Sequence, residues 1–452
     1  MPVDKSFVIG LLLLMMNSAH ADGWKVGLAK RIITPTEPLW MAGYAARTKP
    51  AEGKLQDLWI RTLAIEDPQG NEGVILSADV VGISRYVWDA VIDRLGEEFD
   101  RSQLMFNSSH THSGPVFGGT LSDMYPLDET QKARVQAYTA SFIERSVEAI
   151  QEARQKKSPA HLAIGQGTAT FAANRRNNPE AEVPARRSAG TLVGPFDHSV
   201  PVLRLTHPDG GLRAVVFLYA CHNTVLDGYE WSGDYAGFAQ DKLERDHPGI
   251  QAMFVAGCGG DQNPLPRRKV ALAEQYGNEL AAAVDKVLSH SMREVKGSLD
   301  TRMELVSCDL GERPTREDLE KRVAGPADYQ QRWASRILSD IKAGKPPLLA
   351  YSVPVQRWRV GDLLWISMGG EVVVDYALQF KALFGPETWV SAYSNDVMAY
   401  IPTRRVLLEG GYEGRTAMIP YGMPAYQWAD SIEDRLTQSA LRLVRGPSVT
   451  QP

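Results

Sequence analysis

The chain has 452 residues, of which 44% are hydrophobic and 23% are charged, as is usual for a globular protein with a sizeable core. Its formal net charge is −5 and it has no dense block of Lys and Arg, which argues against nucleic acid as a partner. Cys221, Cys258 and Cys308 have no CxxC spacing, which excludes a thiolate zinc cluster. We expect buried free thiols, with a Cys221–Cys258 bridge as the alternative.

The first 21 residues have the pattern of a secretory signal peptide. Lys5 precedes an apolar run from Phe7 to Met16, and Ala19-His20-Ala21 follows it. The run of about ten residues is shorter than the roughly 20 that a spanning helix needs, which favours cleavage over a retained membrane anchor. Residues 22–452 are then expected to be secreted or periplasmic, with at most peripheral membrane contact.

Turn residues between short apolar runs predict three β-hairpins, which join residues 61–66 to 73–78, 202–206 to 212–220, and 349–359 to 363–368. Helical periodicity is expected over residues 137–155, 235–245, 274–288, 316–341, 372–384 and 431–443. Gly325-Pro326 should divide the fourth of these helices. The mixture predicts an α/β fold, a large single domain with mixed β-sheets flanked by helices.

The most informative segment is an apolar strand, Gln103–Ser109, that ends in His110-Thr111-His112. Histidines two apart at a strand end can present both imidazoles to one metal ion, or one can bind while the other serves the reaction. Two hydrogen-bonded loop histidines are the alternative. His222 repeats the setting at the end of the run 212–221, and this repetition favours a metal site at strand ends.

Spacing alone is less informative about oxygen ligands. Glu371 follows the strand 363–368 and Gly369-Gly370, so its carboxylate could bind a metal at the entry to a helix or simply cap that helix. For Tyr400 and Tyr412, packing in the core or at a rim is the default. We expect Asp234 to cap the helix over 235–245, with a role as carboxylate partner of a ligand histidine as the alternative.

At these residues the chain resembles the neutral ceramidases, specifically their N-terminal catalytic domain. The likeness runs nearly end to end, over Val26–Ala29, Met41–Tyr44, His110–Pro115, Asn174-Arg175, Cys221-His222, Gly260-Asp261 and Tyr412–Gly414. The chain stops soon after the helix predicted over 431–443, so we expect no C-terminal immunoglobulin-like domain of the kind that family carries.

The resemblance implies one Zn²⁺ per chain, held by His110, His222, Glu371 and Tyr400. Such an ion would lower the pKa of a ligating water toward about 7 and polarise the substrate carbonyl. Cleavage of an amide needs a nucleophile, a stabiliser for the oxyanion and an acid for the leaving amine. Zinc can supply the first two.

The resemblance also places His112, Arg175 and Tyr412 at active-site polar positions. We expect His112 to hydrogen-bond the water, the oxyanion or the leaving group, Tyr412 to donate to the oxyanion, and Arg175 to clamp the polar head of the substrate. Asn263 stands where the ceramidases carry a serine implicated in activity. Its side-chain amide is expected to donate in place of that hydroxyl.

The resemblance therefore predicts a secreted zinc amidase that cleaves the N-acyl amide bond of ceramide or a related N-acylated lipid, amine or amino sugar. A zinc-dependent esterase or deacylase would share every ligand and is one alternative. The other is a secreted binding protein that retains zinc without turnover, which the change to Asn263 suggests.

Overall fold

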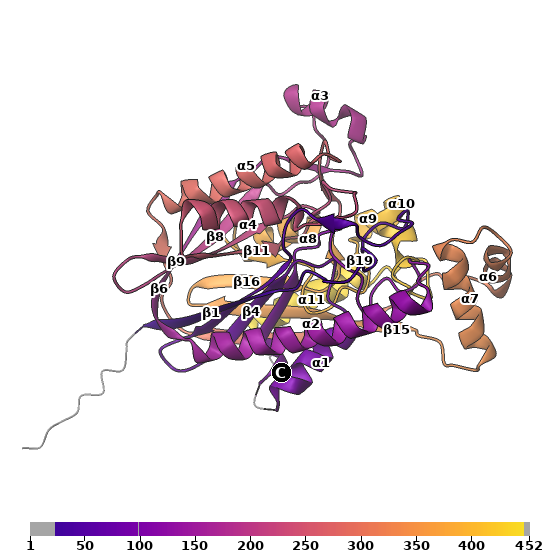
Figure 1. The fold of residues 1–452 in the computed structure, drawn as a ribbon, viewed down its shortest axis with the longest axis horizontal. Coiled ribbons are helices and arrows are strands. Elements are labelled where there is room, and N and C mark those ends of the chain that lie inside the picture. Colours follow the sequence, from indigo (N-terminus) through magenta and orange to yellow (C-terminus); the bar gives the residue numbers. More distant parts are fainter. Residues whose placement is uncertain (1–22, 98, 447–452) are drawn as a thin grey trace, which may run out of the picture.

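The computed structural model describes residues 23–97 and 99–446 (Figure 1). The predicted signal peptide lies outside the described residues. Two main β-sheets pack face to face and helices cover their outer faces, so the predicted mixed α/β domain is confirmed. Over the ranges 23–97 and 99–446, no helix is both long and apolar enough to cross a membrane.

The larger sheet has nine strands, and its main path runs β11-β9-β8-β6-β1-β3-β4-β5, with β13 beside β6. The bounds are β1 Trp24–Ile32, β3 Trp59–Glu66, β4 Glu72–Ala78, β5 Leu104–Ser108, β6 Ser158–Thr168, β8 Ser199–Thr206, β9 Leu212–Tyr219, β11 Gln251–Ala256 and β13 Arg293–Glu294. The two ends of the path approach each other, because Ala256 N donates to Asn107 Oδ1 at 3.0 Å. Accumulated strand twist therefore brings the loops after β5 and β11 together.

The smaller sheet has the order β14-β15-β16-β18, with bounds Leu299–Asp309, Ala350–Val360, Leu363–Met368 and Trp389–Ser391. Three two-stranded pairs complete the strands: β2 (Gly53–Lys54) with β10 (Glu230–Trp231), β7 (Ala172–Asn174) with β12 (Gln262–Pro264), and β17 (Glu371–Val372) with β19 (Tyr400–Ile401). The inner faces of the two main sheets share an apolar core that includes Met105, Met253 and Trp358.

Helices cover the outer faces of both sheets (Figure 1). On the larger sheet, α1 (Arg85–Leu95) and α2 (Glu129–Gln155) pack over β3, β4 and β5, while α4 (Asp234–Asp246) and α5 (Val270–Leu288) pack over β8, β9 and β11. On the smaller sheet, α8 (Asp375–Phe384) lies against β18, and α11 (Ile432–Arg445) lies against β14 and β15. The remaining α-helices of the described residues are α3 Val183–Ser188, α6 Arg316–Val323, α7 Tyr329–Lys342, α9 Arg404–Glu409 and α10 Gly411–Gly414.

All three predicted hairpins and the break between α6 and α7 are confirmed. Helix α2 begins eight residues before the predicted start, because the Asp128 carboxylate caps it by accepting from Gln131 N at 2.7 Å. The prediction of a helix from residue 372 is wrong at its start, since β17 occupies Glu371–Val372. The three cysteines are free and buried, as expected.

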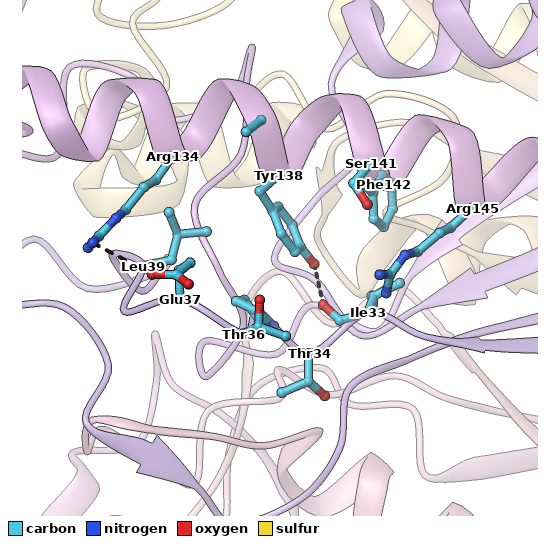
Figure 2. A pocket seen from close by; sticks show the side chains of 12 residues that line it. Ile33, Thr34, Thr36, Glu37, Leu39, Arg134, Tyr138, Ser141, Phe142 and Arg145 are labelled. Carbon is cyan, nitrogen blue, oxygen red and sulfur yellow. Dashed lines mark hydrogen bonds and ion pairs between the residues drawn. The ribbon is translucent and has the colours of Figure 1, made fainter.

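The segment that follows β1 is fastened to the surface of α2. A depression of about 210 Å³ lies between them. Figure 2 shows Tyr138 in this depression, where its Oη donates to Ile33 O at 2.7 Å. Arg134 and Arg145 flank the depression and donate to the carbonyls of Pro38 and Ile32. These contacts position the segment that precedes residues 41–44, and residues 41–44 lie beside the candidate site.

Candidate metal centre

Three histidines come from the ends of two strands of the larger sheet. His110 and His112 follow β5, and His222 follows β9. The two loops are joined by a bridge between Thr111 and Asn223. The ligand nitrogen atoms of the three imidazoles all lie within 4.8 Å of one another. We call these three histidines the nitrogen half of the site.

Backbone carbonyls orient two of the imidazoles. His110 Nδ1 contacts Val81 O at 2.5 Å, and His222 Nδ1 contacts Gly259 O at 2.6 Å. A carbonyl can only accept, so each Nδ1 carries the hydrogen and each Nε2 presents a lone pair, the tautomer that a metal ligand needs. His110 also has φ 61°, a left-handed conformation that costs a non-glycine residue roughly 1–3 kcal/mol and clusters at functional sites.

His112 is held by packing rather than by a hydrogen bond to its ring. Its Nε2 lies 3.1 Å from His110 Nε2, while its buried Nδ1 has no hydrogen-bond partner among the described residues. Gly43, at φ 98°, lies so close that an added Cβ would be 2.4 Å from His112 Cγ. Tyr44 packs edge-on at 4.8 Å between ring centroids, and Arg47 donates to His112 O at 2.7 Å. The ring is fixed in place, but neither nitrogen is committed to a backbone carbonyl.

The candidate oxygen ligands come from a separate pair of short strands, β17 and β19. The parallel pairing of β17 with β19 places Glu371 opposite Tyr400. Glu371 Oε2 lies 3.1 Å from His110 Nε2 and 3.0 Å from His222 Nε2. Tyr400 Oη lies 3.1 Å from His222 Nε2. We call Glu371 and Tyr400 the oxygen half of the site.

Helix capping is not the role of Glu371. Helix α8 begins at Asp375 with Val374 as its N-cap, so the expectation that Glu371 stands at the entry to a helix is wrong. Tyr421 Oη donates to Glu371 Oε1 at 2.5 Å instead. The other oxygen, Oε2, is buried and accepts no hydrogen bond from the residues that the structure describes.

Arg175 connects the oxygen half to its surroundings. It donates from Nη2 to Tyr400 Oη at 3.0 Å, from Nη1 to Asn263 Oδ1 at 3.1 Å and from Nε to Glu413 Oε1 at 2.7 Å. Tyr412 lies at the solvent-exposed edge of the metal centre. Its side chain is 44% exposed, and its ring centroid is 5.3 Å from that of Tyr400. All eight predicted site residues are therefore brought together.

The convergent acceptor atoms fit a bound cation. Glu371 Oε2, which accepts no hydrogen bond within the described chain, faces the lone pairs of His110 Nε2 and His222 Nε2. Three acceptors at such distances repel one another unless a positive ion lies between them. Imidazole nitrogen, carboxylate and phenol oxygen form a donor set that suits Zn²⁺. His112 offers a further nitrogen on the same side.

Burial keeps His112 and His222 neutral. Burial and the nearby Arg175 guanidinium lower the pKa of His222 to about 4. Burial also lowers the pKa of His112 well below its usual value, and the neighbouring His110 and His222 act in the same direction. Neutral imidazoles can bind a metal or accept a proton at pH 7, so both metal binding and proton transfer are electrostatically feasible.

Sequence reasoning missed three residues that shape the site: Gly43, Glu413 and Tyr421. Gly43 and Glu413 lie in segments that carry the family resemblance, but no spacing marks them as neighbours of His112 and Arg175. Tyr421 has no sequence signal, because only the fold brings it to Glu371.

Asp234 does not play either expected role. It is the first residue of α4, and Gly233 occupies the N-cap position. Its buried carboxylate accepts from the backbone N–H groups of Val225 and Leu226 at 3.2 and 2.8 Å and from that of Tyr235 at 2.7 Å. Asp234 therefore fastens the loop that follows His222 to the start of α4.

The chain is similar to one family of known proteins. The family described as "Neutral/alkaline non-lysosomal ceramidase, N-terminal" matches residues 24–264. The neutral ceramidase of Pseudomonas aeruginosa is 23% identical over an alignment that spans 92% of this chain and 73% of that protein. Neutral ceramidase 2 of Arabidopsis thaliana is 32% identical over 120 residues, 25% of this chain and 16% of that protein.

Solved structures show the same fold. The crystal structure of the Pseudomonas aeruginosa neutral ceramidase has a TM-score of 0.66 at 21% identity and covers 92% of this chain and 75% of its own. A structure described as a ceramidase complexed with C2 has a TM-score of 0.69 at 20% identity and covers 95% of this chain and 77% of its own. The resemblance seen in the sequence is confirmed.

Proposed function

Because the chain belongs to the neutral/alkaline non-lysosomal ceramidase family, we propose that it is a zinc-dependent amidohydrolase. Its substrate in this proposal is ceramide or a related N-acylated lipid or amine, cleaved at the N-acyl amide bond. The relatives named neutral ceramidases support this substrate class. We further propose that the protein acts outside the cytoplasm, on the basis of the signal-peptide pattern in residues 1–21.

One observation carries the proposal: buried Glu371 Oε2 faces two Nε2 lone pairs at 3.0 and 3.1 Å. His110, His222, Glu371 and Tyr400 would hold the ion. When bound, Zn²⁺ would supply a water of lowered pKa and polarise the amide carbonyl. The backbone carbonyls of Val81 and Gly259 accept hydrogen bonds from the two imidazoles. They hold both rings in the orientation that metal binding needs before substrate binds.

The remaining polar side chains then serve the substrate. His112 is neutral, reaches the centre with Nε2 and has no competing partner on Nδ1 within the described residues, so it can take a proton from water and return it to the leaving amine. Tyr412, at the rim, donates to the oxyanion. Arg175 already donates to three side chains, so it can offer the substrate only its remaining N–H groups.

Asn263 acts on the substrate partly through Arg175. Its Oδ1 accepts from Arg175 Nη1, which leaves the NH₂ group as the donor in place of the family's serine hydroxyl. This arrangement supports turnover and weighs against a protein that only binds, because the side chain at this position remains part of the polar network around Tyr400.

The test is elemental analysis of the purified protein together with release of fatty acid from ceramide before and after chelation. We expect one zinc per chain and chelator-sensitive release, which zinc restores. His222→Ala should lose both metal and turnover, whereas His290→Ala, at an exposed histidine, should lose neither. A matched ester substrate, assayed beside the amide, distinguishes an esterase from an amidase.

Turnover by metal-free His222→Ala protein would overturn the metal mechanism. Faster cleavage of the ester with no cleavage of the amide would move the protein to the esterase alternative. One zinc per chain without turnover of either substrate would favour a binding protein.

A further inference from the structure

The depression between α2 and the segment after β1 is a concave site separate from the metal centre. The twelve residues that line it include none of the eight predicted site residues. Its base is apolar, with buried Ile33, Leu39 and Phe142, and the ring centroid of Tyr138 lies 6.5 Å from that of Phe142. Its volume of about 210 Å³ is below the roughly 300–1,000 Å³ of pockets that hold drug-sized ligands. The depression therefore suits a short hydrocarbon chain or a single ring.

Two arginines lie at opposite ends of the depression, with Tyr138 between them (Figure 2). Arg134 and Arg145 are far enough apart along α2, by roughly 16 Å of helical rise, that one small anion can contact only one of them. Arg134 donates to Pro38 O at 2.9 Å, and its Nη2 lies 3.7 Å from Glu37 Oε2. A carboxylate of the chain therefore already accompanies Arg134.

Arg145 is not matched in this way. Its Nη1 donates to Ile32 O, but no carboxylate of the described residues lies within 4.0 Å of its guanidinium. Glu148, three residues further along the same helix, lies 3.6 Å from Arg31 Nε instead. The positive charge of Arg145 therefore lies beside an apolar base with N–H groups left to donate. A guanidinium is well matched to a carboxylate, because its planar fork can donate two parallel hydrogen bonds.

We propose that this depression binds a monocarboxylate with a short apolar chain. The carboxylate pairs with Arg145, and the chain lies along Tyr138 and Leu39 toward Arg134. The inference goes beyond the proposed function and does not depend on it. The proposed reaction would nevertheless supply a ligand of this class, because hydrolysis of an N-acyl amide releases a carboxylate.

The experiment is isothermal titration calorimetry of the purified, zinc-loaded protein with octanoate, octan-1-ol and acetate. We expect octanoate to bind most tightly. Octan-1-ol has the chain without the charge and should bind at least about tenfold more weakly, because hydrogen bonds to charged groups are the stronger ones. Acetate has the charge without the chain and should lose about fourfold for each CH₂ group that is no longer buried.

Variants of the lining test the two parts of the ligand separately. Arg145→Gln should weaken octanoate binding at least about tenfold and leave octan-1-ol binding unchanged, which also shows that the depression is still formed. Ala137→Phe should weaken the binding of both ligands, because the added ring occupies the depression. Arg94→Gln, at an exposed arginine of α1 outside the lining, is the matched control and should bind both ligands normally.

A carboxylate is also a ligand for zinc, so the titration is repeated with His222→Ala. We expect this variant to retain the octanoate binding that Arg145→Gln weakens. Binding that His222→Ala loses and Arg145→Gln keeps would place the carboxylate on the metal and overturn the proposal. Failure of the parent protein to bind octanoate would overturn it as well. Neither result bears on the proposed function, because ceramide hydrolysis is measured separately.

Discussion

The nitrogen half and the oxygen half of the site are held in different ways. Backbone carbonyls at Val81 and Gly259 orient His110 and His222, and these carbonyls follow from the path of the chain. Side chains position the oxygen half instead, since Tyr421 donates to Glu371 and Arg175 donates to Tyr400. His110 and His222 should therefore resist side-chain substitution nearby, while His112 and the oxygen half should depend on particular neighbours.

The largest effect should come from Glu371→Gln, which breaks the oxygen half. Glutamine has nearly the same shape but brings no negative charge, and its NH₂ group can donate to a histidine Nε2 that the carboxylate could only repel. We expect metal to be lost and turnover to fall by at least about 10³-fold, because losing the ion removes more than the single transition-state donor whose loss costs up to about 10³-fold. Metal content and steady-state kinetics measure both.

The same variant also tests how Glu371 affects the stability of the metal-free protein. Without metal, Glu371→Gln should unfold no more easily than the parent, because an unsatisfied buried acceptor that costs about 1–3 kcal/mol has become a donor. Glu409→Gln removes the same charge from an exposed carboxylate and should keep metal and activity. Full metal content in Glu371→Gln would contradict the assignment of Glu371 as a required ligand.

This contrast explains what could be predicted from sequence. A strand that ends in a histidine is a local pattern, so the nitrogen half can be predicted from residues near β5 and β9. Glu371 and Tyr400 meet only through the register of β17 with β19, and no local pattern encodes that pairing. Family resemblance alone singled out Tyr400, and its true setting required the fold.

The same distinction between local and long-range signals applies to the fold. Hairpins with marked turns and most amphipathic helices can be predicted close to their observed bounds, because their signals are local. The start of α2 is the exception, since it lies eight residues before the predicted one. Strand order, the meeting of β5 with β11 through Asn107, and the contact of Gly43 with His112 depend on residues far apart in the chain. Strand β1 and helix α1 were not predicted, although their residues lie in the cores of the larger sheet.

A smaller effect should come from Gly43→Ala, which disturbs the packing around the His112 imidazole and leaves the oxygen half unchanged. An added Cβ would lie 2.4 Å from His112 Cγ, so the imidazole must shift. A displacement of about 1 Å can cost about 10²-fold in rate, and we expect a fall in kcat of that order with metal content retained. Kinetics and elemental analysis on the same preparation test this.

Gly70→Ala provides the matched control, because Gly70 has φ 89° and no atom within 4 Å of an added Cβ. It bears the same backbone strain without the collision and should keep full activity. In a His112→Asn background, Gly43→Ala should cause no further loss of turnover, since both changes act on one group. Independent, additive losses would mean that Gly43 acts on something other than His112.

The smallest effect should come from Asp234→Asn, which tests the backbone support of the nitrogen half. Burial raises the pKa of Asp234 to about 6, against an unfolded value near 3.8. The folded protein therefore holds this proton more tightly, so the contribution to stability is greatest below about pH 4 and is lost as the pH rises through about 6. Asparagine does not titrate, and it tolerates the left-handed backbone at this position, φ 55°.

We expect the unfolding free energy of the parent, relative to Asp234→Asn, to fall by up to about 3 kcal/mol between pH 4 and pH 7. Urea unfolding of both metal-free proteins measures this difference and avoids the separate pH dependence of metal binding. Asp209→Asn, in the exposed turn between β8 and β9, controls for the substitution itself. Parallel pH profiles for the parent and Asp234→Asn would show that the loop after His222 is held without help from a buried, protonated carboxyl group. The nitrogen half would then rest on the backbone alone.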